Sequence, residues 1–172
     1  MKRVRLSNKE VKTLKETYSQ LAPVLESADV VEVVQISENS ALYLVDGEPL
    51  LLKATAGELG AFIVPTLYLI HKSQRGRLLP NYPRAVVDPG AVARIVNGAD
   101  VMRPGIQQFI GDFNKGDVVL VADGKGRVIA ISVALYPRAE MEQMQKGKVL
   151  LNVHHLGDKI WDLSLKLVKE KP

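Results

Sequence analysis

The sequence of 172 residues contains no cysteine. Disulfide bonds, thiolate metal sites and cysteine nucleophiles are therefore excluded, and a cytoplasmic protein is expected. Long apolar runs are also missing, because the longest, residues 60–70, is interrupted by Pro65 and is much shorter than the roughly 18 residues that suggest a membrane span. No apolar segment follows the charged start of the chain, so we expect neither a secretory signal nor a membrane partner.

Aromatic residues are scarce as well, at 5% of the chain. Proteins that hold single-stranded nucleic acid by stacking need exposed aromatic rings. Several rings of this chain lie within apolar patterns and are predicted to be buried, namely Tyr43, Phe62, Tyr68, Phe109 and Phe113. If RNA is the ligand, we expect the protein to recognise its backbone and shape rather than its bases.

Positive charge exceeds negative charge, with 23 basic residues against 19 acidic ones, and it is clustered. Residues 2–15 carry six basic residues and one acidic residue, residues 26–58 carry one and seven, and residues 72–84 carry four and none. Such blocks are usually solvated surfaces, and a basic balance also suits a nucleic-acid partner. A protein-interaction adaptor that docks a partner through the acidic block or the 72–84 loop is the alternative.

No constellation of catalytic residues stands out. Residues 111–117 have glycines at the separation of a phosphate-binding loop, but Asp117 stands where that loop needs lysine. His154 and His155 are neighbours on a predicted strand and point to opposite faces, so they cannot both bind one metal. We expect one histidine to be buried and the other to face a ligand. The prediction is a protein that is not an enzyme and uses no cofactor or metal.

The first half of the chain begins with a helix signal. Ser7 and Glu10 have the spacing of a capping box, and apolar residues then recur at steps of three and four. Strands are predicted at residues 30–36, 41–45 and 50–54. The dipeptide Asp46-Gly47 favours a tight hairpin between the last two. Pro65 is expected to be the first residue of a short helix.

The second half has equally clear local signals. Asp88 and Pro89 have the pattern of a helix N-cap and first helical position, and Gly98 that of a helix stop. Pro104-Gly105 predicts a type II turn, in which glycine adopts a positive φ. The remaining predictions are strands at 117–122 and 127–136 around a hairpin, a short helix or turn at 141–147, a strand at 148–154 and a helix at 160–169. Residues 73–83 are the predicted linker.

This order of segments resembles the PUA domain, the small pseudobarrel found in pseudouridine synthases and archaeosine transglycosylases. The motifs that carry the resemblance are Val87-Asp88-x-Gly90-Ala91, Gly98-Ala99-Asp100-Val101-Met102-x-Pro104-Gly105-Ile106, Lys115-Gly116-Asp117-x-Val119 and residues 126–131. Helix, turn and strand signals occur in the order that the family has.

The rest of the chain is similar to the malignant T-cell amplified sequence family, in which a pre-PUA domain precedes the PUA domain. The matching motifs are Asp46-Gly47-Glu48-Pro49-Leu50, Pro65-Thr66-Leu67, Leu69-Ile70-His71-Lys72, Leu79-Pro80 and Asn152-Val153-His154-x-Leu156-x-Asp158-x-Ile160-Trp161. The resemblance implies an α+β fold, with an N-terminal pre-PUA α/β domain at residues 1–82. A C-terminal PUA pseudobarrel, mainly β with short helices, is expected at residues 83–172 and includes the C-terminal helical segment. The absence of cysteine and the basic charge suit an archaeal relative.

The resemblance also implies a function. It indicates a non-enzymatic RNA-binding protein of the translation machinery that binds rRNA or tRNA through the PUA domain, in initiation, reinitiation or recycling on the small ribosomal subunit. The chain has no module of the SUI1 type, so a separate SUI1-type protein is the expected partner. An accessory RNA-binding subunit of a tRNA or rRNA modification enzyme is a further alternative.

The family places RNA in a groove formed by the PUA helix, the strand that follows it and the closing strand. The corresponding positions here are Arg94, Gly98, Arg103, Pro104, Gly105, Lys148 and His154. The residues themselves support part of this set, because Arg94 and Arg103 flank a segment rich in small residues, and arginine forms forked hydrogen bonds to phosphate.

Overall fold

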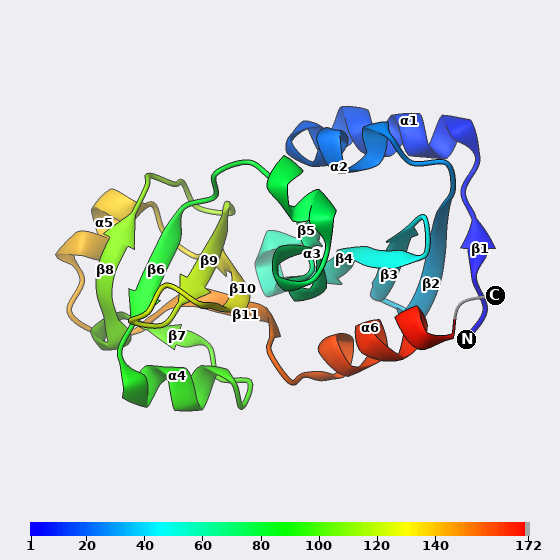
Figure 1. Ribbon diagram of the computed structural model, residues 1–172. Coiled ribbons are helices and arrows are strands. Elements are labelled where there is room, and N and C mark those ends of the chain that lie inside the picture. The colour runs from blue at the N-terminus through cyan, green and yellow to red at the C-terminus, as the bar shows by residue number, and fades with distance from the viewer. Residues whose placement is uncertain (171–172) are drawn as a thin grey trace. The chain divides into compact units, whose positions relative to one another are not determined.

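The computed structural model describes residues 1–170, which form two compact units. Of the described residues, the first unit contains 1–81 and 162–170, and the second contains Tyr82–Trp161. Both combine a β-sheet with short helices, so the predicted α+β fold is confirmed (Figure 1). None of the helices in residues 1–170 is long and apolar enough to cross a membrane.

The first unit is built on a five-stranded antiparallel sheet in the order β1-β2-β3-β4-β5. Its strands are β1 (Val4–Arg5), β2 (Val31–Ser37), β3 (Ser40–Val45), β4 (Glu48–Thr55) and β5 (Ala61–Pro65). Its helices are α1 (Asn8–Thr17), η1 (Ser19–Leu21), α2 (Ala22–Glu26), η2 (Gly57–Leu59), α3 (Leu67–His71) and η3 (Gln74–Leu78). Helix α6 (Lys159–Lys169) also belongs largely to this unit.

Local signals in the sequence explain how these elements begin. Ser7 caps α1, and the reciprocal hydrogen bonds of a capping box with Glu10 are both present. The hairpin between β3 and β4 turns at Asp46 and Gly47, with φ of 49° and 86°, as a tight two-residue turn requires. Pro65, in contrast, ends β5 instead of beginning a helix, because the Thr66 side chain caps α3 by accepting from the Leu69 N–H.

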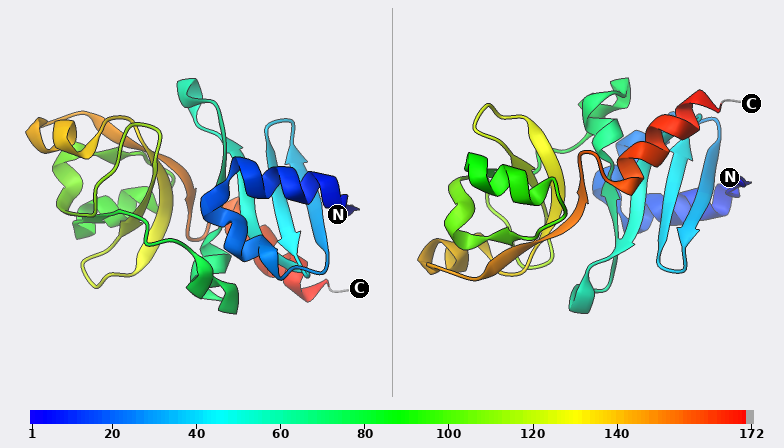
Figure 2. Two further views of the ribbon diagram at one scale, coloured as in Figure 1. Left: turned by 90° about the horizontal axis from the view of Figure 1, so that it is seen from above. Right: turned by 90° about the horizontal axis from the view of Figure 1, so that it is seen from below.

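Helices cover both faces of this sheet. Helices α1 and α2 lie on one face and α6 lies on the other, as the views from above and below show (Figure 2). Accordingly β3 is buried on both faces from Ala41 to Val45, the pattern of a strand at the centre of a layered domain.

The C-terminal helix is assigned differently from the prediction. We expected it to belong to the PUA domain, but residues 162–170 group with the first unit. Leu165 and Val168 pack against the core of that unit, and Leu167 is buried. The Arg3 guanidinium donates to the Leu167 carbonyl oxygen at 2.8 Å. The apolar stripe of the helix therefore completes the N-terminal core.

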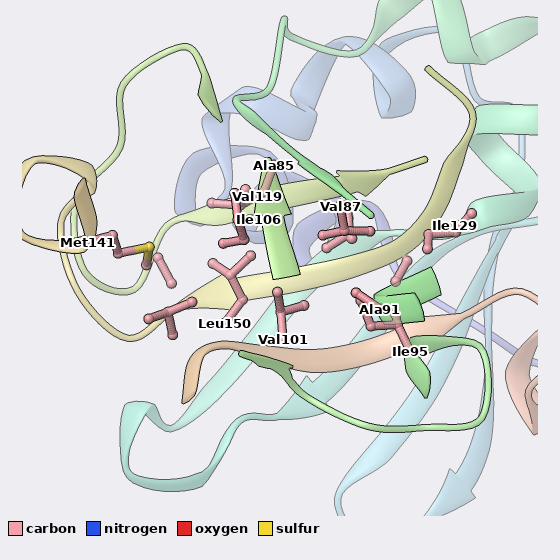
Figure 3. Packing of buried hydrophobic residues seen from close by; sticks show 14 of the residues in the cluster. Ala85, Val87, Ala91, Ile95, Val101, Ile106, Val119, Ile129, Met141 and Leu150 are labelled. Atoms are coloured by element: carbon pink, nitrogen blue, oxygen red, sulfur yellow. The ribbon is translucent and has the colours of Figure 1, made fainter. Parts of the chain in front are cut away.

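The second unit is a six-stranded curled sheet in the order β7-β11-β10-β9-β6-β8. Its strands are β6 (Arg84–Val87), β7 (Val101–Met102), β8 (Ile106–Ile110), β9 (Val118–Ala122), β10 (Val128–Ala134) and β11 (Lys148–His155). Its short helices are α4 (Pro89–Ile95), η4 (Arg103–Gly105) and α5 (Arg138–Gln143). Side chains from many of these elements meet in one apolar core (Figure 3).

Three local predictions, two in this unit and one in the segment before it, differ from the structure. Pro104 and Gly105 form a short 3-10 helix instead of a type II turn, and Gly105 is not among the residues with positive φ. Helix α5 begins at Arg138, before the segment predicted at 141–147. The predicted linker at 73–83 contains η3, so much of it is ordered as helix.

Candidate functional site

A groove runs along one side of α4 in the second unit. We call it the α4 groove. It has a volume of about 340 Å³ and is lined by Ala91, Arg94, Ile95, Ala99, Asp100, Met102, Pro104, Gly105 and Lys148. These residues come from α4, η4, β7 and β11 and from the loop after α4. The fold thus brings together four of the predicted site residues, Arg94, Pro104, Gly105 and Lys148.

Small residues bring the backbone close together at the floor of this groove. A Cβ atom on Gly105 would lie 2.9 Å from Cβ of Ala91, which is closer than two carbon atoms pack, so a larger residue would push η4 away from α4. Gly105 is therefore required by close packing instead of by a positive φ. Asp88 caps the start of α4, and its carboxylate accepts from the Ala91 N–H at 2.7 Å.

The charges at the rim of the groove are unequal. Arg94 is exposed in the last turn of α4, and within residues 1–170 it has no carboxylate partner. Lys148 is half exposed and lies 3.1 Å from Asp100, measured from Nζ to Oδ2. Asp100 also accepts from the Asn152 N–H at 2.8 Å. The cations at the rim outnumber the acids, and the one acid is already hydrogen-bonded.

Gly98 lies at the turn that follows α4. It is exposed with φ of +100°, and a Cβ atom added there would lie 3.8 Å from Nε2 of His155. The resemblance implies His154 as the histidine at the RNA groove, but the structure shows that this side chain is not accessible. His154 is 1% exposed, and its Nδ1 lies 2.8 Å from a carboxylate oxygen of Asp158. Since neighbours on a strand face opposite sides, burial of His154 leaves His155 as the one that is partly exposed.

The pair of His154 and Asp158 fastens the end of β11 to the start of α6. Burial raises the pKa of Asp158, but hydrogen bonds from His154 and from the N–H groups of Trp161 and His155 outweigh it, so the pKa is lowered. The Asp158 carboxylate accepts from the Trp161 N–H at 2.8 Å and the His155 N–H at 2.8 Å. His154 therefore stabilises the fold from inside.

Arg103 also lies away from the groove it was predicted to line. Its Nε donates to the Met141 carbonyl oxygen at 2.7 Å and its Nη1 to the Ile106 carbonyl oxygen at 3.3 Å. Its guanidinium carbon lies 5.2 Å from the centre of the Phe109 ring. These contacts join η4 and β8 to α5, so Arg103 is a structural residue here.

Asn152 is a residue of the site that the sequence did not reveal. Its side-chain Nδ2 donates to the carbonyl oxygens of Ile95 at 3.0 Å and Ala99 at 2.9 Å. These bonds hold the end of α4 and the following loop against β11. Asn152 Oδ1 is buried without a hydrogen-bond partner among the described residues. No sequence signal links Asn152 to α4, because the contact forms only when the sheet has folded.

Family models match nearly the whole chain. Residues 83–156 match the PUA domain, and residues 2–73 match a domain of unknown function, DUF1947. The predicted order, a PUA domain after a separate N-terminal domain, is thereby confirmed.

Over the described part of the chain, no three or more metal-ligating side chains come together as a group that could hold a metal ion.

Relatives match along most of their length. An uncharacterised protein from Methanocaldococcus jannaschii is 36% identical over 94% of this chain and 96% of its own. Translation machinery-associated protein 20 from Saccharomyces cerevisiae is 28% identical, covering 93% and 87%. Malignant T-cell-amplified sequence 2 from Mus musculus is 28% identical, covering 83% and 76%. A crystal structure of a hypothetical Pyrococcus horikoshii protein has a TM-score of 0.72 at 32% identity, covering 95% and 99%.

Proposed function

Because the chain belongs to the family that joins a DUF1947 domain to a PUA domain and includes the malignant T-cell-amplified sequence proteins, we propose that it binds RNA of the translation machinery. The PUA domain implies RNA binding. The name of the yeast relative associates that protein with the translation machinery. Binding through the α4 groove requires no catalytic group.

The observation that carries the proposal is the exposed guanidinium of Arg94 beside a groove with a floor of small residues. A sugar-phosphate backbone approaches closely where few side chains protrude, and arginine donates two parallel hydrogen bonds to one phosphate. Lys148 also lines the groove, with its Nζ 3.1 Å from Oδ2 of Asp100. The groove thus suits backbone contact, which the shortage of exposed aromatic rings also favours.

The type of RNA and the step of translation can also be proposed. We infer that the target is rRNA of the small ribosomal subunit or tRNA, in initiation, reinitiation or recycling in the cytoplasm. A separate SUI1-type protein is the proposed partner. As an accessory subunit of a modification enzyme, the chain would instead copurify with that enzyme and not with ribosomes.

The test is equilibrium binding of the purified protein to small ribosomal subunits and to free tRNA, at low and near-physiological salt. Saturable binding that persists at the higher salt is expected for at least one of them. Arg94→Gln should weaken this binding and reduce the slope of log affinity against log salt by about 0.7 for single strands or about 0.9 for duplexes. Lys115→Gln is the matched control, because Lys115 is exposed in the loop before β9 and does not line the α4 groove.

The results separate the possibilities. Loss of all binding by the wild-type protein at the higher salt would contradict the proposal and leave a protein partner as the function to pursue. Equal effects of Arg94→Gln and Lys115→Gln would place the RNA elsewhere on the chain. The unfolding midpoint of each variant shows whether a loss of binding reflects a loss of folding.

The adaptor alternative receives less support from the charges in the first unit. Arg75 from the basic 72–84 block lies 2.7 Å from an oxygen of Asp46 and 3.5 Å from an oxygen of Glu48. Part of the basic loop and part of the acidic block therefore neutralise each other within the unit. Lys72 and Arg77 remain exposed.

A further inference from the structure

A second cavity lies on the opposite side of α4 from the α4 groove. We call it the hairpin pocket. It has a volume of about 590 Å³ and is lined by Pro89, Val92, Gln107, Asp123, Gly124, Lys125 and Arg127. These residues come from α4, from β8 and from the tip of the β9–β10 hairpin. The hairpin tip lies beside α4 in the view from below (Figure 2). None of its residues belongs to the site predicted from the sequence.

The hairpin pocket has two exposed cations and one acid that is already engaged. Lys125 and Arg127 are exposed and have no carboxylate partner in the part of the chain that the structure describes. The Asp123 carboxylate accepts from the backbone N–H groups of Lys125 and Arg127, both at 2.9 Å. It therefore shapes the turn, and the two side chains above it remain available to an anion.

Between the two cavities, α4 forms a low ridge. Its exposed residues at this side include Pro89, Gly90 and Ala93, which are small and uncharged. The nearest acid, Asp88, caps the helix through its hydrogen bond to the Ala91 N–H. Arg94 stands on the groove side of the ridge, and the two hairpin cations stand on the other. No exposed acid on α4 opposes a polyanion that crosses it.

We propose that one RNA strand crosses α4, so that phosphates on one side meet Arg94 and phosphates on the other side meet Lys125 and Arg127. This inference rests on the proposed function and extends its footprint to the β9–β10 hairpin. A small anion alone would need only one of the two cavities. Cations on both sides of a ridge without acids suit a chain of regularly spaced phosphates.

The experiment measures binding of the full chain to unfractionated tRNA and to isolated small-subunit rRNA across a salt series. Lys125→Gln/Arg127→Gln removes two cations, so the slope of log affinity against log salt should fall by about 1.4 for single strands or about 1.8 for duplexes. Lys115→Gln is again the matched control, since it removes an exposed lysine at the other end of β9. An unchanged unfolding midpoint shows that the hairpin remains folded.

Two outcomes decide the inference. If Arg94→Gln lowers the slope while the hairpin double variant changes it no more than Lys115→Gln does, the hairpin contact is wrong and the proposed function stands. If neither RNA binds the wild-type protein, the proposed function fails and this inference fails with it. A triple variant with Arg94→Gln should show the sum of the separate slope changes, as one shared footprint requires.

Discussion

The exposed side of α4 and the interior of the same unit contain residues of the same types in opposite surroundings. Arg94 stands on the surface without a carboxylate partner, whereas Arg103 donates to two carbonyl oxygens and stacks on Phe109. His155 is partly exposed near Gly98, whereas His154 is buried against Asp158. Charge and residue type alone do not distinguish the residues that are exposed at the surface from those whose side chains hold the fold.

Arg94 and Arg103 differ because the curled sheet of the second unit brings different groups into contact with each side chain. The Met141 carbonyl oxygen of α5, which also accepts from the Met144 N–H at 3.0 Å, and the Ile106 carbonyl oxygen at the start of β8 lie within hydrogen-bonding distance of Arg103. The Arg103 guanidinium donates to both oxygens and so joins α5 to β8. Within residues 1–170, Arg94 has no carboxylate partner, and its guanidinium is exposed to solvent.

The largest effect expected from this comparison is at the paired histidines. His154→Ala should lower the free energy of unfolding by about 3 kcal/mol or more, because it leaves a cavity and removes the partner of a largely buried carboxylate. His155→Ala, its matched control, should cost about 1 kcal/mol or less, since only the hydrogen bond to the Leu156 carbonyl is lost. Chemical denaturation measures both. Equal losses would show that the burial of His154 has no special energetic role.

A smaller effect is expected at Arg103. Arg103→Met should lower the free energy of unfolding by about 1 to 3 kcal/mol, because the carbonyl oxygens of Met141 and Ile106 each lose a charged hydrogen-bond donor and the Phe109 ring loses its cation contact. RNA affinity and its salt dependence should be unchanged in the fraction that remains folded. Denaturation and salt-dependent binding of the same sample check this. A lowered salt slope with normal stability would return Arg103 to the RNA interface.

The smallest effect concerns pH. The pKa of Asp158 is lowered from 3.8 in the folded protein, so the charged carboxylate adds stability that is complete above that value and is lost as the pH falls through the folded pKa. Asp158→Asn should therefore be less stable than the wild type at neutral pH, and the gap should narrow in strong acid. Unfolding free energies across the acid range measure it. If the difference in unfolding free energy between the wild type and Asp158→Asn stayed constant with pH, the charge of Asp158 would contribute nothing to stability.

Much of the fold could be predicted from local signals. The capping box at Ser7, the Asp46-Gly47 hairpin and the Asp88 cap of α4 all formed as expected, because each depends on neighbours in the sequence. The groove could be predicted only in part. Arg94 and Gly105 lie at it, but the ties of Asn152 to α4 and of Arg103 to α5 join segments far apart in the chain. The family resemblance indicates which residues correspond to the RNA site, but it does not show whether each side chain is exposed or packed against other residues.

The path of α6 has a consequence for synthesis on the ribosome. Residues 162–170 complete the core of the first unit, yet they are translated after the whole of the second unit. Domains usually fold in the order in which they emerge, but here the earlier one must wait for a segment made later. The second unit can therefore complete its fold first, because the sheet face of the first unit that α6 covers stays open until residues 162–170 have been translated.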